Sequence, residues 1–175
     1  MDQELVAAAG ALLDTCRDKA LTVAAAESCT GGLLAAALTQ IAGASDVFDR
    51  CFVTYTNAAK QAMLGVPAAV LNAHGAVSRE AALAMVDGVL ARAPVDLAVA
   101  ITGVAGPGGG TPEKPVGLVH IAAAARDGTR HHHEARFGDI GREEVRRRSV
   151  LQAIAMLQAL AEMAEAQVDE DEEEE

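Results

Sequence analysis

The sequence predicts a single α/β domain, with a mixed sheet of about five strands and helices packed on its faces. Short apolar runs typical of buried strands alternate with segments whose apolar residues recur every three or four positions, as in amphipathic helices. Asp127-Gly128 joins two of the later runs and is a strong hairpin signal. Apolar residues make up 51% of the 175 residues and aromatic residues only 2%, so the core is built from small side chains that pack closely.

Each element follows from its local pattern. Helices are predicted over 3–19, 32–41, 57–64 and 78–91, and a last helix is predicted to start at Asp139 or Gly141. Strands are predicted at 21–26, 51–56, 96–101, 116–125 and 130–137. Thr30, Asn57 and Ser78 have side chains suited to the N-caps of the second, third and fourth helices.

The net charge of −11 comes mostly from one end of the chain. All seven residues of 169–175 are acidic, so the rest of the chain carries −4. Such a run repels itself and buries nothing, which predicts a folded domain at 1–166 and a disordered acidic tail at 167–175. The one basic cluster, Arg142 with 146–148, lacks the aromatic residues of a single-strand binding surface, and we expect no nucleic-acid partner.

The cysteines and the N-terminus bear on the cellular setting. Cys16, Cys29 and Cys51 form no CxxC pair and indicate neither a disulfide framework nor a zinc site. His131–His133 would alternate between the two faces of a strand, so we expect no metal ion. The N-terminus has acidic residues where a signal peptide has basic ones, and no apolar run is long enough to span a bilayer. These features predict a soluble cytoplasmic protein with no membrane partner.

Ligands of open α/β sheets bind at the carboxyl ends of the strands, where loops and helix N-termini converge. Three predicted strands end in unusual sequences. The first is followed by 28–32, the second by 55–57 with Lys60 nearby, and the third by 102–117. The sequence therefore predicts a binding site at this edge of the sheet.

The first of these segments is SCTGG. Gly31 and Gly32 leave backbone N–H groups uncovered at a helix N-terminus, which suits an oxyanion or a phosphate, and Ser28 lies beside them. The alternative is that Ser28 or Thr30 only caps the helix and that the glycines only allow close packing. Spacing alone does not separate a nucleophile from a cap.

The second segment brings in Lys60. The chain has three lysines and eleven arginines, so an exchangeable surface cation here would usually be arginine. Lys60 falls in the first turn of its helix, where the dipole disfavours a cation and lowers the lysine pKa. A neutral lysine can act as a base, and Tyr55 could share its proton. The alternative is a solvated helix lysine and a core tyrosine whose hydroxyl lies at the rim.

The third segment, 102–117, holds six of the sixteen glycines and three of the five prolines. Glycines let the backbone approach a ligand while prolines stiffen it, which favours a pre-formed binding loop. No lysine follows Gly108 as a P-loop requires. The expected substrate contacts in this loop are Thr102, Gly103, Gly106 and Gly108.

Taken together, "AESCTGG" (26–32), "YTNAAK" (55–60) and "TGVAGPGGGTPEKPVG" (102–117) resemble, in this order, the signature segments of the CinA C-terminal domain family, the nicotinamide-nucleotide amidohydrolases. The resemblance covers roughly 5–165. It implies an α/β domain that hydrolyses the carboxamide of nicotinamide mononucleotide, a small-molecule substrate, to nicotinate mononucleotide and ammonia. It implies no metal and no cofactor, and we expect a homo-oligomer.

Carried over by position, the resemblance implies that Ser28 is the nucleophile, Lys60 its general base and Tyr55 an assisting hydroxyl. The oxyanion would be held by backbone N–H groups near Thr30, Gly31 and Gly32, or by those of the loop after Thr102. Arg142 and Arg146 match basic positions of the family and would pair with the 5′-phosphate, unless they only form a surface helix with their acidic neighbours. Asn57 and Glu27 complete the expected contacts, and Glu27 would either tune the lysine or face the pyridinium.

The sequence departs from the pattern of this family at two points, and two alternative functions are kept. Cys29 stands where the family is often apolar, and its thiol is itself a candidate nucleophile or oxidation site. Larger family members carry an N-terminal nucleotide-processing domain, so this chain resembles a stand-alone amidohydrolase. The alternatives are a non-catalytic nucleotide-binding or regulatory module, and an amidase with a different substrate.

Overall fold

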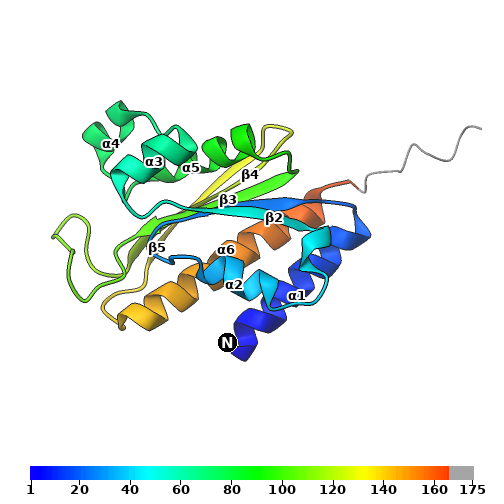
Figure 1. Ribbon diagram of the computed structural model, residues 1–175. Coiled ribbons are helices and arrows are strands. Elements are labelled where there is room, and N and C mark those ends of the chain that lie inside the picture. Colours follow the sequence, from blue (N-terminus) through cyan, green and yellow to red (C-terminus); the bar gives the residue numbers. More distant parts are fainter. Residues whose placement is uncertain (166–175) are drawn as a thin grey trace, which may run out of the picture.

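The computed structural model describes residues 1–165 and contains one five-stranded sheet (Figure 1). Its strands are β1 (Val23–Glu27), β2 (Phe48–Val53), β3 (Leu97–Gly103), β4 (Leu118–Ala125) and β5 (Arg130–Arg136), in the order β2-β1-β3-β4-β5. β1 runs parallel to β2 and β3, while β4 is antiparallel to β3 and β5. The expected mixed sheet of an α/β domain is confirmed. The expected acidic tail, 167–175, lies outside the described residues.

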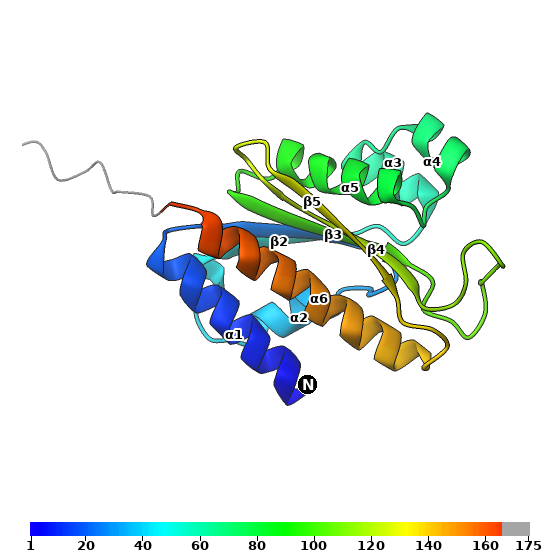
Figure 2. The same cartoon turned by 180° about the vertical axis from the view of Figure 1, so that it is seen from behind.

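Helices cover both faces of the sheet (Figures 1 and 2). α1 (Gln3–Asp18), α2 (Leu33–Thr39) and α6 (Arg142–Met163) lie on one face, and α3 (Asn57–Leu64), α4 (Ala68–His74) and α5 (Arg79–Arg92) lie on the other. A short 3-10 helix, η1 (Ala44–Asp46), precedes β2. Over residues 1–165, none of the helices combines the length and apolarity that crossing a membrane would take.

Small side chains set the spacing between the layers. Every residue of β1 is buried, and alternate residues face opposite layers. Val23 and Ala25 pack with the α1, α2 and α6 side, while Ala24 and Ala26 pack with the α3, α4 and α5 side. Alternation along a strand therefore sends successive side chains to opposite faces, as far as the end of β1.

Several element boundaries differ from the sequence-based expectation. β2 spans 48–53 rather than 51–56, because this edge strand exposes charged residues that interrupt its apolar pattern. α4 was not expected, since a helix of seven residues is too short to display a clear periodicity. The N-cap of α3 is Thr56, whose hydroxyl accepts from Ala59 N, and not Asn57. Ser78 caps α5 as expected.

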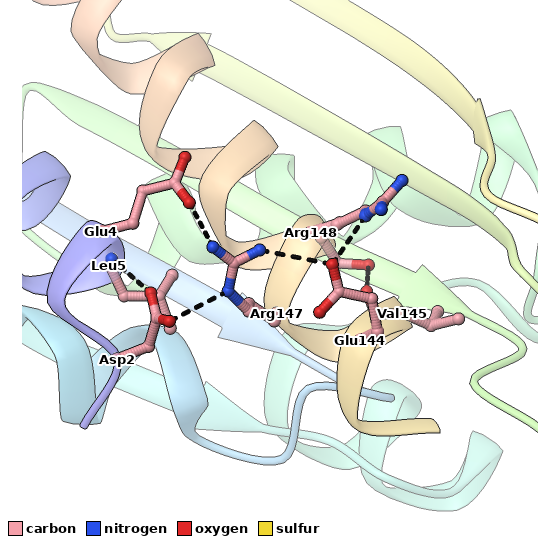
Figure 3. A network of polar contacts seen from close by, with 8 residues as sticks. Asp2, Glu4, Leu5, Glu144, Val145, Arg147 and Arg148 are labelled. Atoms are coloured by element: carbon pink, nitrogen blue, oxygen red, sulfur yellow. Dashed lines mark hydrogen bonds and ion pairs between the residues drawn. The ribbon is translucent and has the colours of Figure 1, made fainter. Parts of the chain in front are cut away.

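A charged network fastens the start of α1 to the start of α6 (Figure 3). The Arg147 guanidinium lies 3.2 Å from Asp2 Oδ2 and 3.3 Å from Glu144 Oε1, and it also pairs with Glu4. Asp2 in turn caps α1 by accepting from Leu5 N at 3.1 Å. One side chain of α6 thus holds the N-terminal helix against the same face of the sheet.

The packing of α5 on α3 gives a test of the fold. A Cβ added at Gly88 would lie 2.2 Å from Leu64 O, whereas one added at Gly10 in α1 would meet Ile41 at an ordinary 3.7 Å. Helix propensity favours alanine over glycine by about 0.5–1 kcal/mol at both positions. We expect Gly10→Ala to stabilise by that amount and Gly88→Ala to destabilise by about 1–3 kcal/mol, because overpacking outweighs propensity. Urea unfolding of both variants measures this, and equal effects would contradict it.

Candidate active site

The carboxyl ends of β1, β2 and β3 meet at one edge of the sheet, beside a cavity of about 310 Å³. Eight of the residues expected in the site line this cavity: Ser28, Tyr55, Lys60, Thr102, Gly103, Gly106, Gly108 and Arg142. The loop 104–117, which projects from this edge in Figures 1 and 2, forms one wall. Segments distant in the sequence therefore converge here.

The centre of the site is a direct contact between Lys60 and Ser28. Lys60 Nζ donates to Ser28 Oγ at 2.9 Å and to the carbonyl of Thr54 at 2.8 Å. Lys60 is 1% exposed and Ser28 is 7% exposed. From the sequence alone these two side chains could be placed only at the ends of neighbouring strands. The structure brings them within hydrogen-bond distance of each other.

Burial changes the chemistry of this lysine. It lowers the pKa of the Lys60 amine, because the charged form loses its water; nearby Cys29 acts in the opposite direction but less. The sequence predicts a lowered pKa through the helix dipole; the direction is the same, but the cause in the structure is burial. A neutral Lys60 amine can donate to Thr54 O while its lone pair accepts the proton of Ser28.

Tyr55 and Arg142 form the rim of the cavity. Tyr55 is 58% exposed, and its hydroxyl accepts from Arg142 Nη2 at 2.7 Å. Arg142 Nη1 donates to the carbonyl of Gly106 at 2.8 Å. The guanidinium therefore ties the end of β2 to the glycine-rich loop, and the Tyr55 hydroxyl bonds to Arg142 instead of Lys60.

In the turn between β1 and α2, two of the four backbone N–H groups that follow Ser28 are already bonded within the protein. Gly31 N donates to Ser28 O at 3.0 Å and Gly32 N to Glu27 Oε2 at 3.0 Å, so these two amides are not free to hold an oxyanion. The N–H groups of Cys29 and Thr30 have no acceptor within residues 1–165, so part of the expected donor set remains available. Thr30 is fully buried, its hydroxyl has no partner within residues 1–165, and the N-cap of α2 is Gly32. The expected Thr30 cap is therefore wrong.

The glycine-rich loop keeps backbone N–H groups available as hydrogen-bond donors. Within the described part of the chain, the N–H groups of Ala105, Gly106 and Gly108 have no acceptor, and all three residues line the cavity. Thr102 is held in place because its hydroxyl donates to Ala76 O at 2.8 Å. Both amide sets expected for an oxyanion therefore keep unbonded N–H groups, and the loop has more of them beside the cavity.

The other expected contacts lie outside the cavity lining. Glu27 is fully buried on the opposite face of the sheet, where it bonds to the start of α2, so it does not face a bound pyridinium. Asn57 is an exposed residue at the start of α3. Arg146 donates to Thr30 O at 2.9 Å and borders a neighbouring hollow of about 660 Å³ that Arg142 also lines.

Sequence reasoning missed two residues of the wall, Ala76 and Val77, between α4 and α5. They contribute apolar surface and backbone, for which the sequence carries no specific signal. It also missed the carbonyl of Thr54, which orients Lys60 through its backbone.

Cys29 lines the cavity beside Ser28. Burial raises the pKa of its thiol to about 11, so it stays protonated near neutral pH. Because the thiolate is the reactive form, Cys29 is a weak competitor for the role of nucleophile.

Residues 6–161 match the family described as the CinA C-terminal domain. This chain belongs to that family. It is 53% identical over 135 residues to a CinA-like protein of Anaeromyxobacter dehalogenans, an alignment that covers 77% of this chain and 33% of the relative. A second CinA-like protein, of Syntrophobacter fumaroxidans, is 50% identical over 141 residues, with coverage of 81% and 33%. The chain thus spans about a third of the length of these curated relatives.

Solved structures of the CinA superfamily have the same fold. The competence/damage inducible protein CihA of Agrobacterium tumefaciens is 55% identical, with a TM-score of 0.88 and coverage of 90% of this chain and 95% of that one. A CinA superfamily protein of Klebsiella pneumoniae is 34% identical, with a TM-score of 0.86 and coverage of 91% and 99%. The arrangement that positions Ser28 and Lys60 here is therefore built on the CinA fold.

The buried lysine of this CinA-family domain gives a testable pH dependence. The pKa of Lys60 is lower in the folded than in the unfolded state, so the folded state binds fewer protons and stability rises with pH until the ordinary lysine pKa of about 10.4. Lys60→Met lacks this titration. The free energy of unfolding of the wild type should rise relative to the variant between neutral pH and about pH 10. Urea unfolding across this range measures the difference, and parallel pH curves would contradict it.

Proposed function

We propose that this domain is a serine amidohydrolase that converts nicotinamide mononucleotide and water to nicotinate mononucleotide and ammonia. The hydrogen bond of 2.9 Å between Lys60 Nζ and Ser28 Oγ carries the proposal, because it pairs a hydroxyl with a buried amine whose pKa is lowered. The three motifs, which resemble those of the amidohydrolases and occur in the same order, favour this substrate over other amides.

In the proposed reaction Ser28 Oγ attacks the carboxamide carbon while Lys60 Nζ takes the hydroxyl proton. The tetrahedral intermediate collapses, Lys60 returns the proton to the departing nitrogen, and ammonia leaves. Lys60 then removes a proton from water, which attacks the acyl ester on Ser28. Release of the carboxylate regenerates the hydroxyl, so one amide and one water give one acid and one ammonia.

The negative charge of the intermediate requires donors close to Ser28. The free N–H groups of Ala105, Gly106 and Gly108 support an oxyanion site in the loop. Gly106 is further anchored because its carbonyl accepts from Arg142 at 2.8 Å. A loop held in this way supplies donors that need no rearrangement during the reaction.

The phosphate of the substrate is assigned to the arginine side of the cavity. Arg142 lines both the cavity and the neighbouring hollow, and Arg146 borders the hollow four residues later on α6. Guanidinium groups suit a phosphate because they bind it through two parallel hydrogen bonds. In this arrangement Tyr55 helps indirectly, since its hydroxyl accepts from Arg142.

The proposed setting is the reducing cytoplasm. Cys16, Cys29 and Cys51 are all free thiols, and none is paired in a disulfide within residues 1–165. A pocket that places Cys29 next to Ser28 is compatible with catalysis where thiols stay reduced.

Substitution of the two neighbouring nucleophile candidates tests the reaction. Ser28→Ala should abolish ammonia release from nicotinamide mononucleotide, since no group remains to form the acyl ester. Cys29→Ala should retain most of it, because the Cys29 thiol is protonated. Ammonia release by pure protein measures both variants. The opposite pattern would assign the reaction to Cys29, and calorimetric binding of the nucleotide without any ammonia would indicate a binding module.

The role of the base is tested by Lys60→Arg, because a guanidinium stays protonated and cannot accept the Ser28 proton. We expect kcat to fall by about 100-fold or more. Lys19→Arg is the matched control, since Lys19 also donates to backbone carbonyls, those of Ala161, Glu162 and Ala164, away from the cavity. A Lys60→Arg enzyme as active as the Lys19→Arg enzyme would remove Lys60 from the reaction.

A further inference from the structure

The residue before Ser28 is a fully buried carboxylate with a complete set of donors. Glu27 Oε2 accepts from Gly32 N at 3.0 Å and Leu34 N at 3.2 Å, and Oε1 accepts from Ala35 N at 2.9 Å. Cys51 Sγ of β2 lies 3.4 Å from Oε1. The carboxylate therefore joins the end of β1 to the start of α2 and to the edge strand.

These contacts replace the usual cap of α2. Its N-cap is Gly32, which has no side chain to accept from the first turn, so the N–H groups of Leu34 and Ala35 would otherwise be unpaired inside the protein. A carboxylate at a helix N-terminus also interacts favourably with the helix dipole. Glu27 thus fixes the two ends of a turn of five residues, 28–32, whose first residue is Ser28.

The main chain of Glu27 reaches the other catalytic side chain. Glu27 O accepts from Thr54 N at 2.8 Å, Thr54 O accepts from Lys60 Nζ at 2.8 Å, and Lys60 Nζ donates to Ser28 Oγ at 2.9 Å. These bonds and the peptide bond from Glu27 to Ser28 close a ring. Ser28 N also donates to Ile101 O at 3.0 Å, which anchors the ring to β3. A shift of Glu27 would therefore change the distance between Ser28 Oγ and Lys60 Nζ.

We infer that Glu27 is a positioning residue for this reaction: its carboxylate, from the opposite face of the sheet, holds Ser28 at the distance from Lys60 that proton transfer needs. The inference rests on the proposed amidohydrolase function. Glu27 touches neither the cavity nor a bound substrate, because it is fully buried and outside the cavity lining. Its removal should slow the reaction without weakening substrate binding.

Glu27→Gln tests this with little change in volume. The new NH₂ group would face backbone N–H donors, so at least one of the three bonds to α2 is lost. We expect kcat to fall about 10- to 100-fold, as a displacement of about 1 Å at a reacting group can cost, while KM changes by less than about threefold. The pH at which kcat/KM rises should stay unchanged, because Lys60 remains the base.

The matched control is Asp127→Asn, which also changes a carboxylate that accepts from a backbone N–H, that of Thr129 at 2.8 Å in the turn between β4 and β5, away from both hollows. It should lower the melting temperature and leave kcat unchanged. An unchanged kcat in Glu27→Gln would overturn the inference, as would a shifted pH midpoint with an unchanged plateau, which would indicate electrostatic tuning of Lys60. If Glu27→Gln does not fold, Glu27→Asp, one methylene shorter, should show the same loss of kcat. If that variant also fails to fold, Glu27 is a requirement of the fold and the inference is overturned.

Labelling of Ser28 by a fluorophosphonate separates this inference from the choice of substrate. Ser28 Oγ attacks phosphorus, the P–F bond breaks, fluoride leaves and the hydroxyl proton passes to Lys60. Mass spectrometry should detect slower labelling in Glu27→Gln than in wild type and none in Ser28→Ala. Slower labelling by a protein whose wild type releases no ammonia would refute the substrate and keep the inference. Equal labelling rates in wild type and Glu27→Gln would overturn the inference whatever the substrate.

Discussion

The burial of the Lys60 amine is the constraint on which the rest of the site depends. A lysine that is 1% exposed loses its hydration, and Nζ recovers two hydrogen bonds, one to Ser28 Oγ and one to Thr54 O. The cost of burying the charge lowers the pKa of the amine, and the two acceptors fix its position. The same burial therefore lowers the pKa of the amine and holds it beside Ser28, the two properties that the proposed base requires.

Small side chains make that burial possible. β1 presents Ala24 and Ala26 to the face on which α5 packs, and α3, which carries Lys60, packs on α5. Larger residues at these two positions would displace α5, on which α3 packs. The 2% aromatic content of the chain is thus linked to the site as well as to the core.

Local patterns predicted the sheet, most helices and the convergence of Ser28, Lys60 and the loop, because strand ends and helix periodicity are encoded by neighbouring residues. They failed where a side chain bonds to a residue that is distant in the sequence or to a backbone group. Thr30 was expected to cap α2 because the hydroxyl stands at the right spacing, but Glu27 takes the first-turn N–H groups. Strand alternation was the available signal, since it places Glu27 and Ser28 on opposite faces. The sequence carries no signal for the hydrogen bond between Lys60 and the carbonyl of Thr54.

Arginines in the first turns of α6 hold the outer part of the site together. Arg142 bonds to Gly106 O and Tyr55, Arg146 to Thr30 O, and Arg147 to Asp2 and Glu4. Three arginines of one helix thus contact the loop, the β1–α2 turn and the start of α1. Because each guanidinium has five N–H donors, these internal bonds leave donors available on Arg142 and Arg146. The helix that braces the walls of the cavity therefore also provides its positive charge.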